Sequence, residues 1–388
     1  MKPSTAPTGI SALLRNVWGG RAEFPPRPEG PLVWLHLPQS APLDSFPLLR
    51  EALEDYHVLI TQPEMDTPSA LHFPFQFDKR QAVDHFLAHW QPALMFWATP
   101  ENGLIAARRG ARAGVKMIFA DIAEQGLLPG FRGRALSEFL QFCARVVVSD
   151  QTDISWFKKH GLTEAQLAYG NPLAEIAKPP LENEALLRRI SGAIGPRPVW
   201  CAIGVSRGEI AALLAAHRHA VKAFPNLLLL VVPRAAADVV AAKITDEGWR
   251  LARLGPDELP HKQAEVLLAE DMAEAGTWMR MATVTYMGGT LYGPEAAEPF
   301  AAVAVGSAVL SGPMQAPHEA RYARLIGADA MAACKTKAEF PACLVAALAP
   351  DRSAELAMNA WTIGSEGAAA IQVIVREIQD LLAEEARP

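Results

Sequence analysis

The sequence predicts an α/β protein made of two doubly wound domains. Short apolar runs alternate with helical patterns along the chain, which indicates βαβ units arranged around a parallel sheet. The pattern stops at a segment rich in proline and glycine and then starts again, and 388 residues are too many for one typical core. Since the apolar runs do not alternate with polar residues, we expect helices on both faces of each sheet.

The first half contains five apolar runs of strand length, separated by amphipathic segments of helix length. The first of these runs includes Val33, Trp34 and Leu35, residue types that favour a buried strand. We expect strands at 31–37, 56–61, 93–98, 115–120 and 144–149, and helices at 46–55, 79–90, 104–113 and 136–142.

The second half repeats this pattern after the proline- and glycine-rich segment 170–197, where we place the domain boundary. The first domain is expected at 1–175 and the second at 176–365, with a C-terminal helix at 366–388 that packs back on the first domain. We expect strands at 198–203, 227–232, 266–269, 283–287 and 308–310, and helices at 208–223, 235–247, 272–281, 296–303 and 354–385.

Composition excludes several classes of protein. Hydrophobic residues make up 50% of the chain and charged residues 20%, as in a well-packed soluble protein. The net charge of −6 provides no general positive field for nucleic acid or anionic lipid. No signal peptide or membrane span is recognised, and residues 10–18 are expected to form a short amphipathic helix that packs on the protein. These features predict a cytoplasmic protein.

The four cysteines lie far apart and form no Cys-x-x-Cys pair, so we expect buried thiols in a reducing compartment rather than a metal site. The sequence also lacks the zinc-protease, P-loop and dinucleotide motifs and shows no Ser-His-Asp set. These absences argue against the common hydrolase, zinc-protease, P-loop and dinucleotide-binding classes. We expect no cofactor.

The stretch from Met287 to Pro299 is the most informative in the chain. A buried strand ends in Gly288 and Gly289, followed by Thr290, and after a short loop Glu298 opens a helix. A strand end with a close backbone approach and an exposed helix N-terminus is how α/β domains build ligand sites. A Glu here could accept hydrogen bonds from a sugar diol. The alternative is an ordinary strand–turn–helix connection.

Three other strand ends of the second half carry candidate binding residues. The strand at 198–203 is followed by Ser206 and Arg207, and the strand at 227–232 by Pro233 and Arg234. An arginine at such a position suits a phosphate or another anionic group. The alternatives are a capped helix with a solvated Arg207 and a surface ion pair for Arg234.

The strand at 266–269 leads into Met272, Ala273 and Glu274, whose backbone N–H groups could contact a nucleobase or phosphate. Acidic residues in a first helical turn also favour the helix dipole without any function. In the first half, His36 ends a strand and could contact substrate, and a buried, hydrogen-bonded histidine is an equal alternative.

Several short motifs follow one another along the chain from about Gly20 to the C-terminus. They are segments 20–21 with 33–36, 86–92 (Phe-Leu-x-x-Trp-x-Pro), 170–171, 197–200 with 208–209, 228–234, 272–274, 288–291 with 298–299, and 312–313. In their order and spacing, these motifs resemble those of the 3-deoxy-D-manno-octulosonic acid (Kdo) transferases, which build the inner core of lipopolysaccharide.

This resemblance implies two Rossmann-like domains facing a cleft, the GT-B glycosyltransferase architecture. It implies inverting transfer of Kdo or a related acidic sugar from a CMP-activated donor to a lipid A precursor. The donor residues are then Ser206, Arg207, Pro233, Arg234, Met272, Ala273, Glu274, Gly288, Gly289, Thr290, Glu295 and Glu298. Peripheral contact with the cytoplasmic face of the inner membrane would follow from such an acceptor, and no nucleic-acid partner is expected.

The chain departs from the family pattern mainly on the acceptor side. Pro42 stands where the family has its general-base Glu, and proline cannot accept a proton. Asp44 and Glu101 are the candidate catalytic carboxylates that remain. Pro294 and Glu295 replace a His-Asn pair. A non-catalytic paralogue that keeps a nucleotide-binding fold and acts as a binding or scaffold protein is therefore the alternative, and a twin-domain epimerase is a third.

Overall fold

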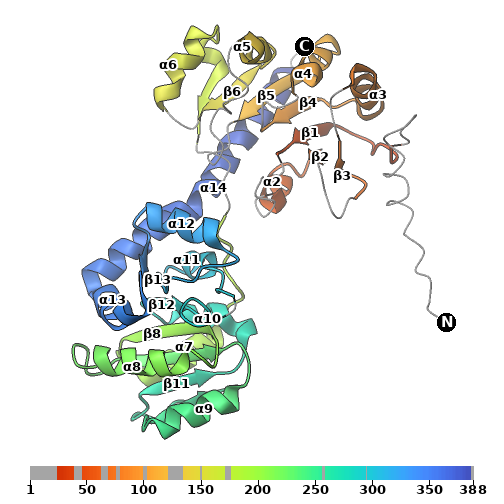
Figure 1. The fold of residues 1–388 in the computed structure, drawn as a ribbon. Helices are drawn as coiled ribbons and strands as arrows, with labels where there is room; N and C mark the ends of the chain where they lie inside the picture. The colour runs from red at the N-terminus through yellow and green to blue at the C-terminus, as the bar shows by residue number, and fades with distance from the viewer. Residues whose placement is uncertain are drawn as a thin grey trace, which may run out of the picture. The chain divides into compact units, whose positions relative to one another are not determined.

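The computed structural model describes residues 24–38, 46–62, 69–75, 79–98, 103–120, 134–148, 151–170, 176–255, 258–293 and 295–385. The chain forms two compact units, one of residues 1–176 with 366–388 and the other of residues 177–365. Each unit contains one parallel sheet with helices between its strands (Figure 1). The prediction of two Rossmann-like, doubly wound domains is therefore confirmed.

The first unit has a seven-stranded sheet in the order β3-β2-β1-β4-β5-β6-β7. The strand β1 pairs in parallel with both β2 and β4, so the strand order reverses beside β1. The short edge strands β3 and β7 were not predicted, because three residues are too few to show a period. The strands are β1 Leu32–His36, β2 His57–Gln62, β3 His72–Pro74, β4 Leu94–Trp97, β5 Lys116–Ala120, β6 Arg145–Val148 and β7 Leu167–Tyr169.

Helices cover both faces of this sheet, as continuous apolar strands require. On one face, Trp34 and Trp97 pack against Phe86 and Trp90 of α3. On the other face, Phe96 and its neighbours pack against α2 and the C-terminal helix α14. The helices are α2 Phe46–Ala52, α3 Arg80–Trp90, α4 Gly103–Arg112, α5 Arg134–Leu140, α6 Gln151–Lys159, the 3-10 turn η2 Glu164–Gln166, and α14 Pro350–Glu385.

The end of α14 is attached to the first sheet by apolar and ionic contacts. Its buried Ile374, Ile378 and Leu381 belong to the same core cluster as Ile118 and Val147 of the sheet. Since residues 366–385 of α14 belong to the first unit, the end of the chain completes the core that its beginning starts.

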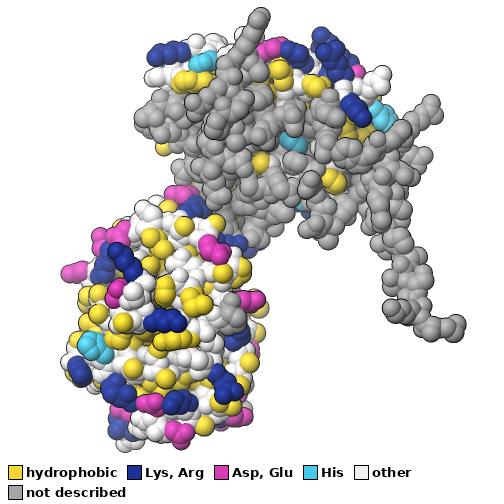
Figure 2. Space-filling view, viewed as in Figure 1, with side chains coloured by type: hydrophobic (Ala, Val, Ile, Leu, Met, Phe, Trp, Pro, Cys, Tyr) yellow, Lys and Arg dark blue, Asp and Glu magenta, His cyan; other side chains and the backbone are white. Residues whose placement is uncertain are grey.

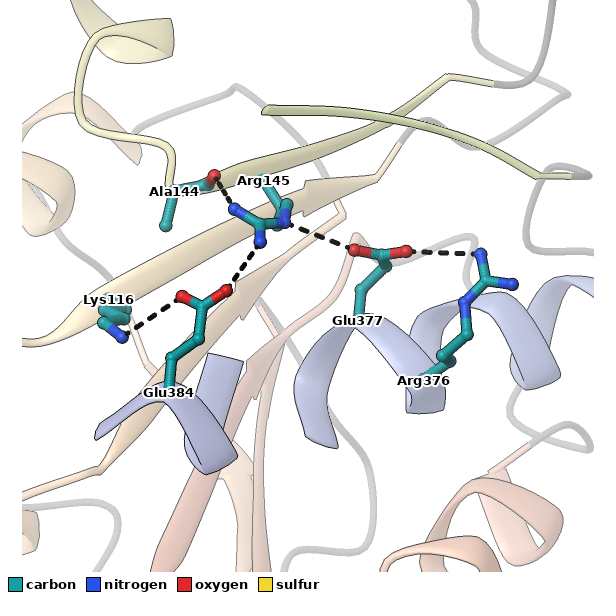
Figure 3. A network of polar contacts seen from close by, with 6 residues as sticks. All are labelled: Lys116, Ala144, Arg145, Arg376, Glu377 and Glu384. Atoms are coloured by element: carbon teal, nitrogen blue, oxygen red, sulfur yellow. Dashed lines mark hydrogen bonds and ion pairs between the residues drawn. The ribbon is translucent and has the colours of Figure 1, made fainter. Parts of the chain in front are cut away.

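Arg145, the first residue of β6, carries the ionic part of this attachment (Figure 3). Its guanidinium lies 3.4 Å from the Glu377 carboxylate and 2.9 Å from that of Glu384. Lys116, the first residue of β5, donates to the Leu381 carbonyl over 3.2 Å. These contacts set the position of α14 along the sheet at the amino ends of two strands.

The second unit has a sheet in the order β10-β11-β9-β8-β12-β13-β14, with all seven residues of β8 buried. The two edge strands of this sheet, β10 and β14, were not predicted: β14 has only three residues, and β10 is not apolar throughout. The strands are β8 Val199–Val205, β9 Leu228–Pro233, β10 Leu251–Leu254, β11 Val266–Ala269, β12 Val284–Met287, β13 Ala308–Ser311 and β14 Met331–Ala333.

Helices on both faces of the second sheet give it two apolar layers. The predicted helices are present with small shifts at their ends, whereas α12 and α13 were not predicted. The helices are α7 Glu184–Ile194, α8 Ile210–Ala220, α9 Ala237–Asp246, η3 Met272–Glu274, α10 Ala275–Arg280, α11 Phe300–Ala304, α12 Glu319–Gly327, η4 Lys337–Glu339 and α13 Phe340–Leu348.

The surface and the thiols agree with the compositional predictions. Figure 2 shows Lys and Arg side chains interspersed with Asp and Glu on the visible face of the second unit. Cys143, Cys201 and Cys334 are buried, all four thiols are free, and burial raises the pKa of Cys143 above its usual range. None of the described helices combines the length and apolar character that crossing a bilayer requires.

Candidate functional site

The candidate site lies at the carboxyl edge of the second sheet, where the loops after β8 and β12 meet. These strands are parallel neighbours, with Ile203 opposite Met287 at their ends. In open α/β sheets, ligands bind at this edge beside the point where the strand order reverses. Here the reversal falls at β8, which lies between β9 and β12. The predicted residues of four strand ends can therefore be located relative to one another.

A buried carboxylate, that of Glu209, joins the two loops. Its Oε2 accepts hydrogen bonds from the backbone N–H and the hydroxyl of Ser206, at 2.8 and 2.9 Å. Its Oε1 accepts from the Tyr286 hydroxyl at 2.5 Å and the Leu291 N–H at 3.2 Å, and both oxygens accept from the Gly289 N–H at 2.9 Å. Glu209 is fully buried, and these donors compensate the cost of burying its charge.

The role of Glu209 was not predicted, although its position has a local signal. Ser206 and Glu209 form the Ser-x-x-Glu pattern of a capping box before the helix α8. That pattern explains the bonds between these two residues but not those to the loop after β12. Burial, and next the Glu209 carboxylate, raise the pKa of the Tyr286 phenol above its usual range, so Tyr286 stays a hydrogen-bond donor.

The double glycine after β12 allows backbone segments of the chain itself to pack closely. Gly289 has a φ of +82°, and a Cβ there would fall on the Glu295 carbonyl oxygen. A Cβ on Gly288 would fall on the Gly204 carbonyl in the loop after β8. The prediction was that these glycines make room for a ligand, whereas the space that each Cβ would fill holds the chain's own backbone. A larger residue at either position would push the two loops apart.

Thr290 supports this packing from inside. Its side chain is fully buried, and its hydroxyl donates to the Met287 carbonyl at 2.6 Å. The same hydroxyl accepts from the Gly312 N–H at 2.8 Å, which links the loop after β12 to the loop after β13. The Thr290 hydroxyl is therefore engaged within the protein.

Arg234 projects from the end of β9 toward the loop after β12. Its Nη2 donates to the Glu295 carbonyl oxygen at 2.9 Å, and its Nη1 lies 3.5 Å from the Glu295 carboxylate. The Arg234 backbone N–H donates to the Val205 carbonyl, which anchors the start of this loop to β8. Pro233 is buried at the end of β9, and Arg207 is exposed. Arg234 and Glu295 thus meet at this edge of the sheet.

Glu298 caps the helix α11. Its Oε1 accepts from the Phe300 N–H at 2.7 Å and its Oε2 from the Ala301 N–H at 2.9 Å. The Arg321 guanidinium lies 3.4 Å from the same carboxylate, whose side chain is 33% exposed. Both oxygens therefore have protein donors, and a sugar diol would have to share them.

The loop that carries Glu295 and Glu298 is attached to the double glycine. The Ala297 N–H, between these two residues in sequence, donates to the Gly288 carbonyl oxygen at 2.8 Å. Arg234 therefore contacts Glu295 at one end of the four-residue segment 295–298, and Glu298 is its other end. The structure brings these predicted donor residues to the same edge of the sheet.

The segment Met272–Glu274 lies in another part of this edge, beside a cavity of about 760 Å³. The Ala273 N–H donates to Asp271 Oδ1 at 2.8 Å, so it is engaged within the turn, and Met272 is 39% exposed. Glu274 accepts from Thr277 and Asn183. The cavity is lined by Asn183, Ala185, Leu186, Arg189, Arg253, Leu254, Gly255, Glu258, Glu270, Asp271, Glu274 and Trp278.

The two catalytic candidates of the first domain, Asp44 and Glu101, lie outside the described residues, as does Pro42. His36 is described, and it is a core residue: it is 3% exposed, and its Nδ1 lies 3.0 Å from the Thr61 hydroxyl. Burial lowers its pKa to about 3, so the ring is neutral at physiological pH. Of the two alternatives for His36, the buried, hydrogen-bonded histidine is confirmed.

The fold and this edge define a class: a protein of two doubly wound α/β domains whose second sheet carries a loop site built on a buried Glu. Among the described residues, no group of three His, Cys, Asp or Glu is placed to hold a metal ion. No family model matches the chain.

Curated relatives then confirm the resemblance to the Kdo transferases. The chain is 33% identical to the 3-deoxy-D-manno-octulosonic acid transferase of Haemophilus influenzae over 115 residues, which are 28% of this chain and 27% of that protein. It is 29% identical to the transferase of the same name from Bordetella pertussis over 311 residues, 75% of this chain and 70% of that protein. The first match thus spans about a quarter of the relative's length.

Two solved structures are also similar. The C-terminal CMP-Kdo binding domain of WaaA from Acinetobacter baumannii is 19% identical, with a TM-score of 0.41 over 47% of this chain and 98% of that one. The UDP-GlcNAc 2-epimerase from Neisseria meningitidis bound to UDP-GlcNAc is 10% identical, with a TM-score of 0.42 over 90% of this chain and 99% of that one.

Proposed function

We propose that this protein is a glycosyltransferase of the Kdo transferase type. Its donor would be a CMP-activated acidic sugar, CMP-Kdo or a related molecule, and its acceptor a lipid A precursor in lipopolysaccharide synthesis. The observation that carries the proposal is the Arg234 guanidinium beside the double-glycine turn, in a chain similar to Kdo transferases over most of its length. An arginine in this position provides a planar, permanently charged donor for a phosphate or carboxylate.

The second unit would bind the donor at the edge organised by Glu209. Arg234 would bind an anionic group of the donor, and Arg207, exposed at the end of β8, would add positive charge nearby. The carboxylate of Glu298 would accept from ribose hydroxyls while it caps α11. Cytosine would lie toward Met272–Glu274, whose Ala273 N–H would first have to leave Asp271.

The transfer itself would be a single displacement at the anomeric carbon. The acceptor hydroxyl oxygen forms a bond to that carbon, the bond from carbon to phosphate oxygen breaks, and CMP leaves with the electron pair. A carboxylate takes the hydroxyl proton, and Asp44 and Glu101 are the candidates. Asp44→Asn or Glu101→Gln should lower the transfer rate by roughly 10² to 10⁴ for whichever residue is the base. If both variants kept the wild-type rate, neither residue would be the base.

A second candidate function is a binding or scaffold protein without turnover. Pro42, at the position of the family's general base, is the observation that favours it. A transfer assay with CMP-Kdo and a lipid A precursor separates the two functions. Turnover supports the transferase, whereas CMP binding without transfer supports the paralogue. Either function would include peripheral contact with the cytoplasmic face of the inner membrane, where a lipid acceptor is available.

Calorimetric titration with CMP tests the donor site directly. Arg234→Ala should weaken CMP binding by about 1.5–3 kcal/mol if the guanidinium forms a charge-assisted bond with the ligand. Arg250→Ala is the matched control, because Arg250 pairs with Glu265 at the amino ends of the strands, away from this edge. Failure of the wild-type protein to bind CMP at millimolar concentration would contradict the proposal.

A further inference from the structure

Arg234 has two different contacts with the same residue. Its Nη2 donates to the Glu295 backbone carbonyl at 2.9 Å, a normal hydrogen-bond distance. Its Nη1 faces the Glu295 carboxylate at 3.5 Å, a looser ion pair. The anion that lies against this guanidinium in the structure is therefore a side chain of the protein.

The two contacts differ in how easily they can be broken. The Glu295 side chain is 70% exposed and that of Arg234 is 40% exposed, so their ion pair is weak and screened by salt. The backbone that follows the carbonyl is anchored, since the Ala296 N–H donates to the Ala316 carbonyl and the Ala297 N–H to the Gly288 carbonyl. The carbonyl contact can therefore hold the guanidinium in place while the carboxylate moves away.

The position of the carbonyl is also determined by packing. It lies where a Cβ of Gly289 would fall, and the Gly289 N–H is bonded to the buried Glu209. Arg234 thus has one partner that is part of a packed, hydrogen-bonded loop and one that is an exposed anion. A ligand that carries a phosphate or carboxylate is chemically equivalent to the second partner and not to the first.

We propose that Glu295 is a built-in competitor that occupies the anion-binding side of Arg234 until an anionic ligand displaces it. This inference rests on the proposed function, since it assumes that Arg234 binds the donor. Glu295 then lowers the affinity of the site for every anionic ligand and favours those whose other contacts compensate the displacement. Because of this competition, the uncharged groups of the donor would have to supply a larger share of its binding free energy.

The test is a titration of the full-length protein with CMP at low and high salt. Glu295→Gln keeps the length and polarity of the side chain but removes the competing charge, so CMP should bind about two- to fivefold more tightly at low salt. The gain should shrink at high salt. In an Arg234→Ala background the same Glu295→Gln change should have no effect. Glu247→Gln, at the end of α9, is the control for a change of net charge elsewhere.

The outcomes separate this inference from the proposed function. If Glu295→Gln binds CMP more tightly than the wild type, and only when Arg234 is present, the result supports the inference that Glu295 competes with the ligand. If the wild type binds CMP and Glu295→Gln binds it equally or less tightly, the competitor is overturned while the donor site remains, and weaker binding makes Glu295 a ligand contact. If neither the wild type nor Glu295→Gln binds CMP, the proposed function is overturned together with this inference. Thermal melts show whether each variant is folded.

Discussion

The carboxylate of Glu209 accepts the Gly289 N–H with both of its oxygens, each at 2.9 Å, although the two residues are 80 positions apart in sequence. Glu209 lies just before α8 and Gly289 follows β12, so this one contact joins two strand-end loops of the second sheet. Because the carboxylate is fully buried, its donors cannot be replaced by water without opening the site. The loops at the candidate site are therefore preorganised by a fully buried residue.

Loss of this carboxylate should destabilise the second unit. Glu209→Ala leaves the Gly289 N–H and the Tyr286 hydroxyl without their buried acceptor, so we expect the free energy of unfolding to fall by about 3 kcal/mol. Urea unfolding measures this change. Glu319→Gln, an exposed carboxylate at the start of α12, should stay within about 0.5 kcal/mol of the wild type. Equal effects of the two variants would show that the Glu209 network adds no stability.

Substitution of two glycines with positive φ allows the cost of backbone strain to be measured separately from the cost of disturbing the loop packing. Gly306 has a φ of +77° and open space where a Cβ would lie. Gly306→Ala should therefore lower the free energy of unfolding by roughly 1–2 kcal/mol, through backbone strain alone. Gly289→Ala, at +82°, adds a collision with the Glu295 carbonyl and should cost at least about 3 kcal/mol. Denaturant titration of both variants checks this order. A Gly289→Ala protein as stable as Gly306→Ala would mean that the loop can move aside without cost.

The C-terminal helix should be necessary for the stability of the first unit. Ile378 of α14 is fully buried against the first sheet, so Ile378→Ala should lower the free energy of unfolding by about 2–5 kcal/mol. Met358→Ala, in the same helix but at a side chain that is 70% exposed, should have little effect. Thermal unfolding of the two variants provides the comparison, and similar melting temperatures would contradict the assigned core.

The free energy of unfolding should also decrease at acid pH, because His217 is buried in its neutral form. Burial lowers its pKa to about 4, and its Nδ1 accepts from the Trp200 indole N–H at 3.2 Å. Below about pH 6.5 the unfolded chain binds a proton that the folded chain does not bind until about pH 4. The contribution of the neutral His217 to the free energy of unfolding is therefore fully present above pH 6.5. It is lost progressively, by up to about 3 kcal/mol, as the pH falls toward 4.

The measurement is the free energy of unfolding between pH 4 and 7 for the wild type and His217→Gln. Gln can still accept from Trp200 but does not titrate, so the variant should show a shallower dependence on pH. His219→Gln, an exposed histidine on the same helix α8, should keep the wild-type slope. If His217→Gln kept that slope as well, His217 would not be the group responsible.

The local sequence pattern was sufficient to predict the fold class and to locate several residues at strand ends. Continuous apolar runs such as Leu228–Pro233 indicate a strand buried on both faces, and alternation with helices indicates a parallel sheet. Arg234 could be placed at the sheet's carboxyl edge because it directly follows such a strand. The three-residue strands β3, β7 and β14 could not be identified, since their pairing partners rather than their own residues define them.

The sequence by itself determined the two doubly wound domains and the residues that follow their strands, because hydrophobic periodicity and turn chemistry are local properties. Only the tertiary structure decided that Glu209 binds the Gly289 loop, that Arg234 faces Glu295, and that Ile374, Ile378 and Leu381 are the α14 side chains that enter the first core. These contacts join residues far apart in sequence. Their partners depend on which strands become neighbours in the sheet, and no local pattern encodes that choice.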